Sequence, residues 1–185
     1  KGREAGEPYH MGCRTLRELD YRPRTDSAYA LRVRAGGLIP IGRTNVPEMA
    51  VMGTTEPQLY GPTHNPWDLA RSPGGSSGGA AAAVAARIVP VAHANDISGS
   101  IRIPASHCGV VGLKPTRGRI VMSAGDAPVG MVTEGVLTRT VREAGRDFCL
   151  TISPVNGLRT SLPPAIAGFF TSVSFRSPSW LKVPC

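Results

Sequence analysis

Residues 73–79 read Pro-Gly-Gly-Ser-Ser-Gly-Gly, and residues 78–87 (GGAAAAVAAR) continue as a run of small residues that predicts a closely packed helix. Glycines bracket Ser76 and Ser77, and glycine permits positive φ and close approach of two backbones. A phosphate-binding loop would need the pattern GxxxxGKS or GxxxxGKT, and no lysine stands at the required position. A flexible linker would not lead directly into a tight helix. The interpretation that remains is a strained catalytic loop.

A second glycine-serine stretch, residues 95–105 (NDISGSIRIPA), follows a predicted strand at 88–92 and leads into a predicted helical turn at 103–108. A serine on a sharp bend between strand and helix exposes its Oγ, and the amides before it converge on one point, as an oxyanion hole requires. Such a bend alone is most often only a turn. Ser76 and Ser100 are 24 residues apart, however, and the intervening helix and strand can bring the two serines together.

These two stretches, GGSSGG at 74–79 and DISGSIRIPA at 96–105, resemble the amidase signature family. Further segments are similar to the same family: GRTNVPE at 42–48, YGPTHNPWD at 60–68 and CGVVGLKPTRGR at 108–119. The resemblance covers residues 5–145. Within the family, TTEP at 54–57 and AHANDISGSIRIPA at 92–105 resemble the branch that contains 6-aminohexanoate cyclic dimer hydrolases and actinobacterial amidases.

The resemblance implies a hydrolase of non-peptide C–N amide bonds, linear or cyclic, that works through a Ser–cis-Ser–Lys unit and an acyl-enzyme. Ser100 is then the nucleophile, and Ser76, on a cis peptide, passes the proton of Ser100 to a buried neutral lysine. The resemblance further implies an oxyanion hole and a set of supporting residues. The oxyanion hole is expected from the backbone N–H groups of Ile97, Ser98 and Gly99 with that of Ser100, and the supporting residues are Ser77, Asp96 and Arg102.

The lysine of this unit has no clear match. The family places it before a glycine-containing loop, usually as Lys-Asp, and here that loop is residues 6–12. Lys1 precedes Ser76 by 75 residues, which fits, but Gly2 follows it and the interval to the loop is short. A terminal lysine is usually mobile and solvated, whereas a base must be desolvated to be neutral near pH 7. We therefore expect the catalytic lysine upstream of residue 1, with Lys1 as the alternative.

The order of predicted elements indicates an α/β fold: an amidase-signature-type core with a mixed central sheet covered by helices, and an incomplete one. We expect a partial domain at 1–146 and a divergent tail at 147–185. Helices are predicted at 26–35 with Asp26 as N-cap, at 46–50, and from residue 141 with Thr140 and Glu143 as a capping box. Strands are predicted at 38–41, 88–92 and 110–113, and a long ordered loop at 53–73.

Composition argues against several other classes. The net charge of +8 is scattered, and no basic run is interleaved with aromatic residues, so no nucleic-acid partner is expected. The four cysteines form no CxxC motif and no histidine is spaced for zinc, so we expect neither a metal nor a cofactor. The longest apolar stretch, residues 80–94, is interrupted and too short for a bilayer. The prediction is a soluble, cytoplasmic protein whose partner is a small-molecule amide, with a homodimer left open.

Two other functions stay open at this point. A Ser-His-Asp triad would use one of the four histidines, His10, His64, His93 and His107, although the GxSxG elbow is absent. A catalytically inactive, amidase-like scaffold or binding protein would result if this chain is truncated and lacks the lysine base.

Overall fold

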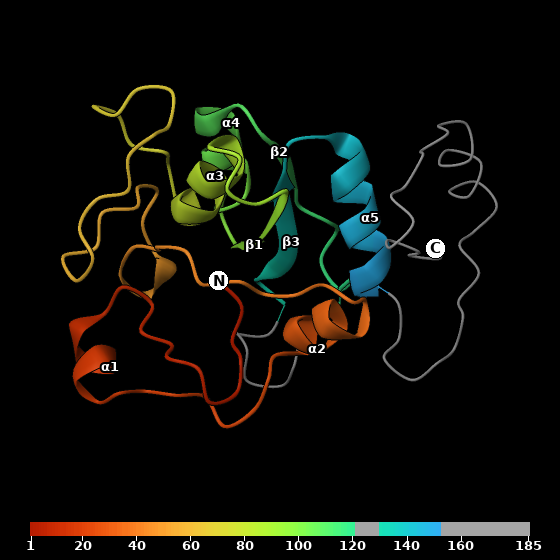
Figure 1. Ribbon diagram of the computed structural model, residues 1–185, viewed down its shortest axis with the longest axis horizontal. Coiled ribbons are helices and arrows are strands. Elements are labelled where there is room, and N and C mark those ends of the chain that lie inside the picture. Colours follow the sequence, from red (N-terminus) through yellow and green to blue (C-terminus); the bar gives the residue numbers. More distant parts are fainter. Residues whose placement is uncertain (121–129, 153–185) are drawn as a thin grey trace.

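A small sheet lies between two layers of helices in the computed structural model, which describes residues 1–120 and 130–152 (Figure 1). The strands are β1 (Val91–Asp96), β2 (Val111–Leu113) and β3 (Thr133–Thr138), in the order β1-β3-β2. Both pairings of β3 are antiparallel, and they set Asn95 of β1 opposite Glu134 of β3. The expected α/β class is confirmed.

The two faces of the sheet are covered by different helices. Helices α3 (Gly78–Ala85) and α4 (Arg102–Cys108) pack on one face, and α2 (Ala28–Ala35) and α5 (Val141–Ile152) lie on the other. Successive strand side chains point to opposite faces, so Leu137 enters the core with α3 and α4. Its neighbour Val136 packs instead with a second cluster, which comprises Tyr29, Ile120 and Ala144.

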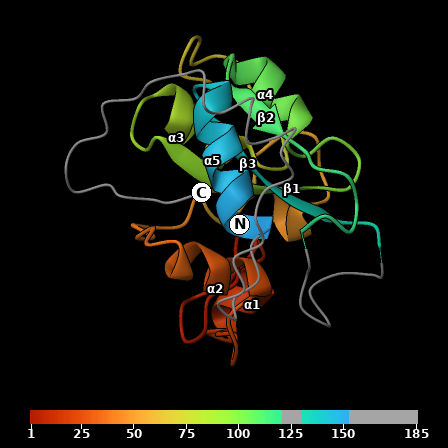
Figure 2. The ribbon, with the colours of Figure 1, turned by 90° about the vertical axis from the view of Figure 1, so that its right-hand side faces the viewer.

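The N-terminal part of the chain lies below the sheet, where α1 (Arg14–Glu18) and α2 are found in both views (Figure 2). The N-cap of α2 is Ser27, whose Oγ accepts a hydrogen bond from the Ala30 amide at 3.1 Å. The prediction of Asp26 as the cap is wrong. Its carboxylate accepts from the Ala5 amide at 2.8 Å and pairs with Arg34 at 2.7 Å, and so holds the first residues against α2.

Helix α5 begins at the predicted capping box. The amide of Glu143 donates to Thr140 Oγ1 at 3.2 Å, and Glu143 Oε2 accepts from the Thr140 amide at 3.0 Å. The helix runs through position 146, the predicted end of the first domain. Residues 153–185 of the predicted tail lie outside the described residues, so the division at 146 stays a prediction.

The strand predictions are confirmed in part. The strand at 110–113 corresponds to β2, the one predicted at 88–92 lies instead at Val91–Asp96, and β3 was not predicted. The prediction of a strand at 38–41 is wrong. Ile39 and Ile41 are 84% and 74% exposed, and Pro40 between them has no amide hydrogen to donate to a neighbouring strand. The helix predicted at 46–50 is only a three-residue 3-10 turn, η1 (Glu48–Ala50).

The predicted loop at 53–73 has no helix or strand apart from one bridge between Asn65 and Asp68. It is ordered because its side chains bond to the end of α4. Trp67 Nε1 donates to the Cys108 carbonyl at 2.7 Å, and Asn65 Nδ2 donates to the His107 carbonyl at 2.8 Å. The loop therefore has a fixed position beside the helix that follows Ser100.

Gly79 offers a test of how tightly α3 is packed. A Cβ at this residue would lie 2.5 Å from both the backbone N and O of Asn45. We expect Gly79→Ala to lower the free energy of unfolding, measured with urea, by about 1–3 kcal/mol because backbone must move. Gly42→Ala is the control, since no atom lies within 4 Å of its added Cβ. Equal stabilities of the two variants would contradict this packing.

Candidate active site

The loop at 74–79 is held by close backbone contacts. The Gly75–Ser76 peptide bond is cis, as the resemblance implied, and Ser76 and Ser77 are fully buried. A Cβ at Gly75 would lie 2.5 Å from the Thr54 carbonyl oxygen, so only glycine fits there. Thr55 Oγ1 donates to the Gly74 carbonyl at 2.9 Å and accepts from the amide of Gly78 at 3.1 Å. Contacts with Thr54 and Thr55 of the 53–73 loop therefore fix the position of the 74–79 loop.

Ser100 reaches this loop through a backbone hydrogen bond. The amide of Ser77 donates to the Ser100 carbonyl at 3.2 Å. Ser100 lies on the bend between β1 and α4, directly after Gly99, whose φ is 136°. The structure thus brings together the two serine segments that the sequence places 24 residues apart.

The amine of Lys1 lies at Ser76. Its Nζ donates to Ser76 Oγ and, at 2.8 Å, to Oδ1 of Asn95 on β1. The Lys1 side chain is thus partly buried and bonded rather than solvated, and its sequence interval to the 6–12 loop is no obstacle. The expected lysine upstream of residue 1 stays a prediction. Sequence reasoning also missed Asn95, although two adjacent polar residues, Asn95 and Asp96, directly before the Ser100 bend were a usable signal.

Several backbone bonds hold the segment that carries Lys1. The Ser27 amide donates to the Arg3 carbonyl at 2.9 Å, and the side chain of Arg43 donates to the Gly2 carbonyl. Together with the bond from Ala5 to Asp26, these contacts tie residues 1–5 to the start of α2 and to Arg43 in the loop after it. The bonds at Gly2, Arg3 and Ala5 fix the backbone that follows Lys1, and this places the Lys1 amine at Ser76.

Burial changes the acid–base properties of Lys1. Desolvation, the largest effect, lowers the pKa of its amine from 10.5 to about 7, while the carboxylates of Glu134 and Asp96 act in the opposite direction. A neutral amine is therefore accessible near pH 7. A lysine in this state can take a proton from a neighbouring hydroxyl.

Asp96 organises the bend that carries Ser100. Its buried carboxylate accepts from the amides of Gly99 at 2.8 Å and Ile101 at 3.0 Å. Arg102 donates to both of its oxygens, from Nε at 3.0 Å and Nη2 at 2.9 Å, so two of the expected supporting residues form an ion pair on this bend. Burial raises the pKa of Asp96, but the hydrogen bonds from Arg102 and the amides outweigh it and lower the pKa to about 2.

The hydrogen bonds of Asp96 show which of the amides expected in the oxyanion hole already have an acceptor. The Gly99 amide already has Asp96 as its acceptor. Within residues 1–120 and 130–152, the amides of Ile97, Ser98 and Ser100 donate to no protein group. Three backbone donors therefore stay available around Ser100.

The side chains of three of the four histidines have partners outside the serine loops. His10 Nδ1 lies 2.5 Å from the Tyr60 hydroxyl, His64 Nδ1 lies 2.7 Å from the Leu69 carbonyl, and His93 pairs with Glu134. In the described part of the chain, no histidine is bonded to either serine. The same part contains no cluster of three or more histidine, cysteine or acidic residues that could hold a metal ion. None of the described helices is long and apolar enough to cross a membrane.

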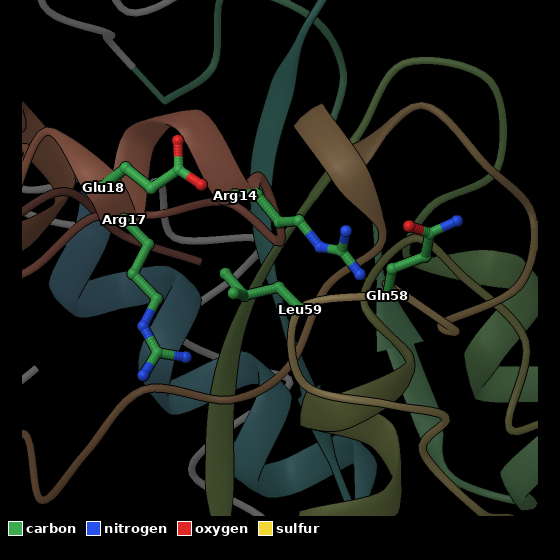
Figure 3. A pocket seen from close by; sticks show the side chains of 5 residues that line it. All are labelled: Arg14, Arg17, Glu18, Gln58 and Leu59. Atoms are coloured by element: carbon green, nitrogen blue, oxygen red, sulfur yellow. The ribbon is translucent and has the colours of Figure 1, made fainter.

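A hollow of about 410 Å³ lies elsewhere, between α1 and the 53–73 loop (Figure 3). Neither serine and no residue bonded to them borders it. Its lining residues are Arg14, Arg17, Glu18, Gln58 and Leu59.

Comparison with known proteins gives consistent matches. The family model described as Amidase matches residues 5–183. The 6-aminohexanoate-cyclic-dimer hydrolase of Paenarthrobacter ureafaciens is 53% identical over 148 residues, which cover 78% of this chain and 29% of that protein.

Solved structures of related enzymes also match this chain. The structure of 6-aminohexanoate cyclic dimer hydrolase complexed with substrate matches with a TM-score of 0.77 and 43% identity, covering 88% of this chain and 34% of that one. A bacterial aryl acylamidase of the amidase signature enzymes matches with a TM-score of 0.75 and 37% identity, covering 80% of this chain and 31% of that one. The chain thus spans about a third of the length of these relatives.

The low pKa of Asp96 predicts how stability depends on pH. Its folded-state pKa of about 2 lies below the ordinary 3.8, so its contribution is present above about pH 4 and is lost as the pH falls toward 2. In Arg102→Ala, urea unfolding at pH 5 and pH 2.5 should show a smaller loss of stability on acidification. Arg119→Ala, at an exposed arginine, is the control. The same acid dependence in both variants would refute the role given to Arg102.

Proposed function

Because this chain belongs to the amidase family, whose model matches residues 5–183, we propose that it carries the catalytic serines of a hydrolase of non-peptide C–N amide bonds. The observation that carries the proposal is the hydrogen bond between the Lys1 amine and Ser76 Oγ, beside the segment of Ser100. The three groups correspond to the Ser–cis-Ser–Lys unit that the sequence motifs implied. The alternative of a scaffold without a base is less well supported, since a lysine lies at the site.

In the first step, Ser100 Oγ attacks the carbonyl carbon of the amide. The proton of Ser100 moves to Ser76 Oγ, and Ser76 passes its own proton to the neutral Lys1 amine. A serine hydroxyl needs such a base, and a lysine whose pKa is about 7 is well matched to proton transfer near neutral pH.

The tetrahedral intermediate places a negative charge on the former carbonyl oxygen. The free amides of Ile97, Ser98 and Ser100 are suited to stabilise this charge, and Asp96 holds the backbone that presents them. In this proposal Gly99 contributes the shape of the bend, because its own amide is bonded to Asp96. Ser77 supports the arrangement through its bond to the Ser100 carbonyl.

Collapse of the intermediate breaks the C–N bond. The Lys1 ammonium returns a proton through Ser76 to the leaving amine, which leaves an acyl group on Ser100. Water then attacks the acyl carbon and the same relay takes its proton. The bond between the acyl carbon and Ser100 Oγ breaks, the relay returns the proton to Oγ, and the acid product leaves.

The substrate class proposed is a small-molecule amide, linear or cyclic. This is supported by the similarity to 6-aminohexanoate cyclic dimer hydrolase, which has been solved with its substrate. The homodimer and the cytoplasmic location stay predictions from the sequence.

A fluorophosphonate probe tests the nucleophile. We expect the probe to label Ser100, and Ser100→Ala to abolish labelling as read by mass spectrometry. Ser76→Ala should slow labelling by about 10²-fold or more, because the proton of Ser100 loses its acceptor. Ser106→Ala, at an exposed serine of α4, is the control and should label normally. Labelling that survives Ser100→Ala would remove Ser100 as nucleophile, and a folded chain that is never labelled would favour the inactive scaffold.

The pH dependence of labelling tests the base. The rate should rise as the pH passes about 7, because the Lys1 amine can accept a proton only when it is neutral. Lys1→Met should remove this rise and slow the reaction. Lys114→Met is the control, since the Lys114 amine bonds to the Pro115 carbonyl rather than to the site. A Lys1→Met variant with the original pH profile would show that the base lies elsewhere.

A further inference from the structure

A buried acid–histidine pair lies beside the Lys1 amine and is not part of the Ser–Ser–Lys unit. His93 Nε2 and Glu134 Oε2 are 2.5 Å apart, and the two side chains are only 14% and 11% exposed. The residues come from neighbouring antiparallel strands, His93 from β1 and Glu134 from β3. A pair of titratable side chains buried in a sheet needs a reason beyond packing, because removing charge from water is costly.

The Lys1 segment packs directly on this pair. The Lys1 amine donates to Asn95, and Asn95 lies opposite Glu134 in the strand register. A Cβ at Gly2 would lie 3.4 Å from Nδ1 of His93, so the backbone after Lys1 passes close to the Nδ1 edge of the imidazole. Glu134 therefore faces Lys1 from the sheet, while His93 lies between Glu134 and the lysine backbone.

We propose, on the premise of the function proposed above, that Glu134 is a positioning residue for the catalytic lysine and that His93 anchors its carboxylate. Glu134 acts on Lys1 through space, as a negative charge that favours the ammonium. The hydrogen bond from His93 keeps the carboxylate from turning into direct contact with the amine. The ammonium and the neutral amine then stay close in free energy, which a group that both takes and returns a proton requires.

The electrostatics of the pair agree with this division of roles. Burial lowers the pKa of His93 and the Glu134 carboxylate partly offsets it, which favours a neutral imidazole that donates from Nε2. Its Nδ1 is buried and has no hydrogen-bond partner in the described residues, which also disfavours the imidazolium because that proton would have no acceptor. For Lys1, Glu134 is the strongest charge that opposes the effect of burial.

Other titratable groups also lie near Lys1, His93 and Glu134. Asp96 lies on β1 and is held by Arg102. Tyr29 of α2 lies against the His93 ring, with centroids 4.1 Å apart, and its hydroxyl donates to Asp147 of α5 at 3.1 Å. Burial raises the pKa of Asp147 to about 6, although the hydrogen bond from Tyr29 acts in the opposite direction. Asp147 therefore titrates close to the pKa of about 7 of the Lys1 amine.

Titration of the Lys1 side chain tests the proposal without relying on catalysis. Lysine labelled with ¹³C at Cε reports the protonation of its own amine by NMR, and the chain has only three lysines. In Glu134→Gln, the Lys1 pKa should fall by about one pH unit, because the amine loses its main counter-charge. Glu18→Gln, an exposed glutamate of α1, removes the same charge elsewhere and should leave the titration unchanged. Asp147→Asn identifies any contribution of that carboxyl. A Lys1 pKa in Glu134→Gln that equals the Glu18→Gln value would overturn the proposal.

Substitution of His93 gives a second test with the opposite sign. In His93→Phe the aromatic contact with Tyr29 is kept, but Glu134 loses its donor and can approach the ammonium, so the Lys1 pKa should rise. His93→Gln restores a donor and should return the Lys1 pKa toward the original value. If Glu134→Gln does not fold, this pair of variants tests the same inference. An equal pKa in His93→Phe and His93→Gln would rule out the anchoring role.

The probe experiment on Ser100 separates this inference from the proposed function. If Lys1 titrates as expected but Ser100 is never labelled, Glu134 still controls the lysine, and the proposed hydrolase activity fails. If Ser100 is labelled and Lys1 does not respond to Glu134→Gln, the activity stands and the positioning role of Glu134 fails.

Discussion

The amide of Ser77 donates to the carbonyl of Ser100, and this 3.2 Å bond joins the two segments from which the site is built. Around Ser76, glycines let the loop approach other backbone segments at distances that a Cβ would prevent. The added Cβ of Gly75 would lie 2.5 Å from a neighbouring carbonyl oxygen, and Gly79 is equally constrained. A loop enclosed in this way cannot shift alone, so the position of Ser76 follows from the packing of α3 and the 53–73 loop.

The second constraint is electrostatic. Moving an amine out of water destabilises its charged form, and at Lys1 burial brings the pKa from 10.5 to about 7. Two carboxylates partly oppose this lowering of the Lys1 pKa, and they have different partners. Asp96 accepts hydrogen bonds from Arg102 and from backbone amides, whereas Glu134 is hydrogen-bonded to His93. The sheet thus places two carboxylates near the Lys1 amine, while the bend after β1 carries Ser100, the proposed nucleophile.

The parts of the molecule that could be predicted from the sequence are those with a local signal. Ser76 and Ser100 lie in dense glycine-serine patterns, and the Thr140–Glu143 capping box is complete within four residues. The role of Lys1 had no such signal, because its contacts with Ser76 and Asn95 depend on how the first residues dock against α2.

Asp26 shows the same limit. It has the residue type of an N-cap, but a tertiary contact with Arg34 and the Ala5 amide takes its carboxylate, and Ser27 caps the helix instead. Lys1 meets partners 75 and 94 positions away along the chain, and closing such long loops is the slow part of folding. The bend that carries Ser100 is made from neighbouring residues, with Asp96 bonded to the amides of Gly99 and Ile101, and it does not depend on that closure. In the proposed mechanism, a chain whose first residues have not docked against α2 would therefore hold a shaped Ser100 bend without the lysine that takes its proton.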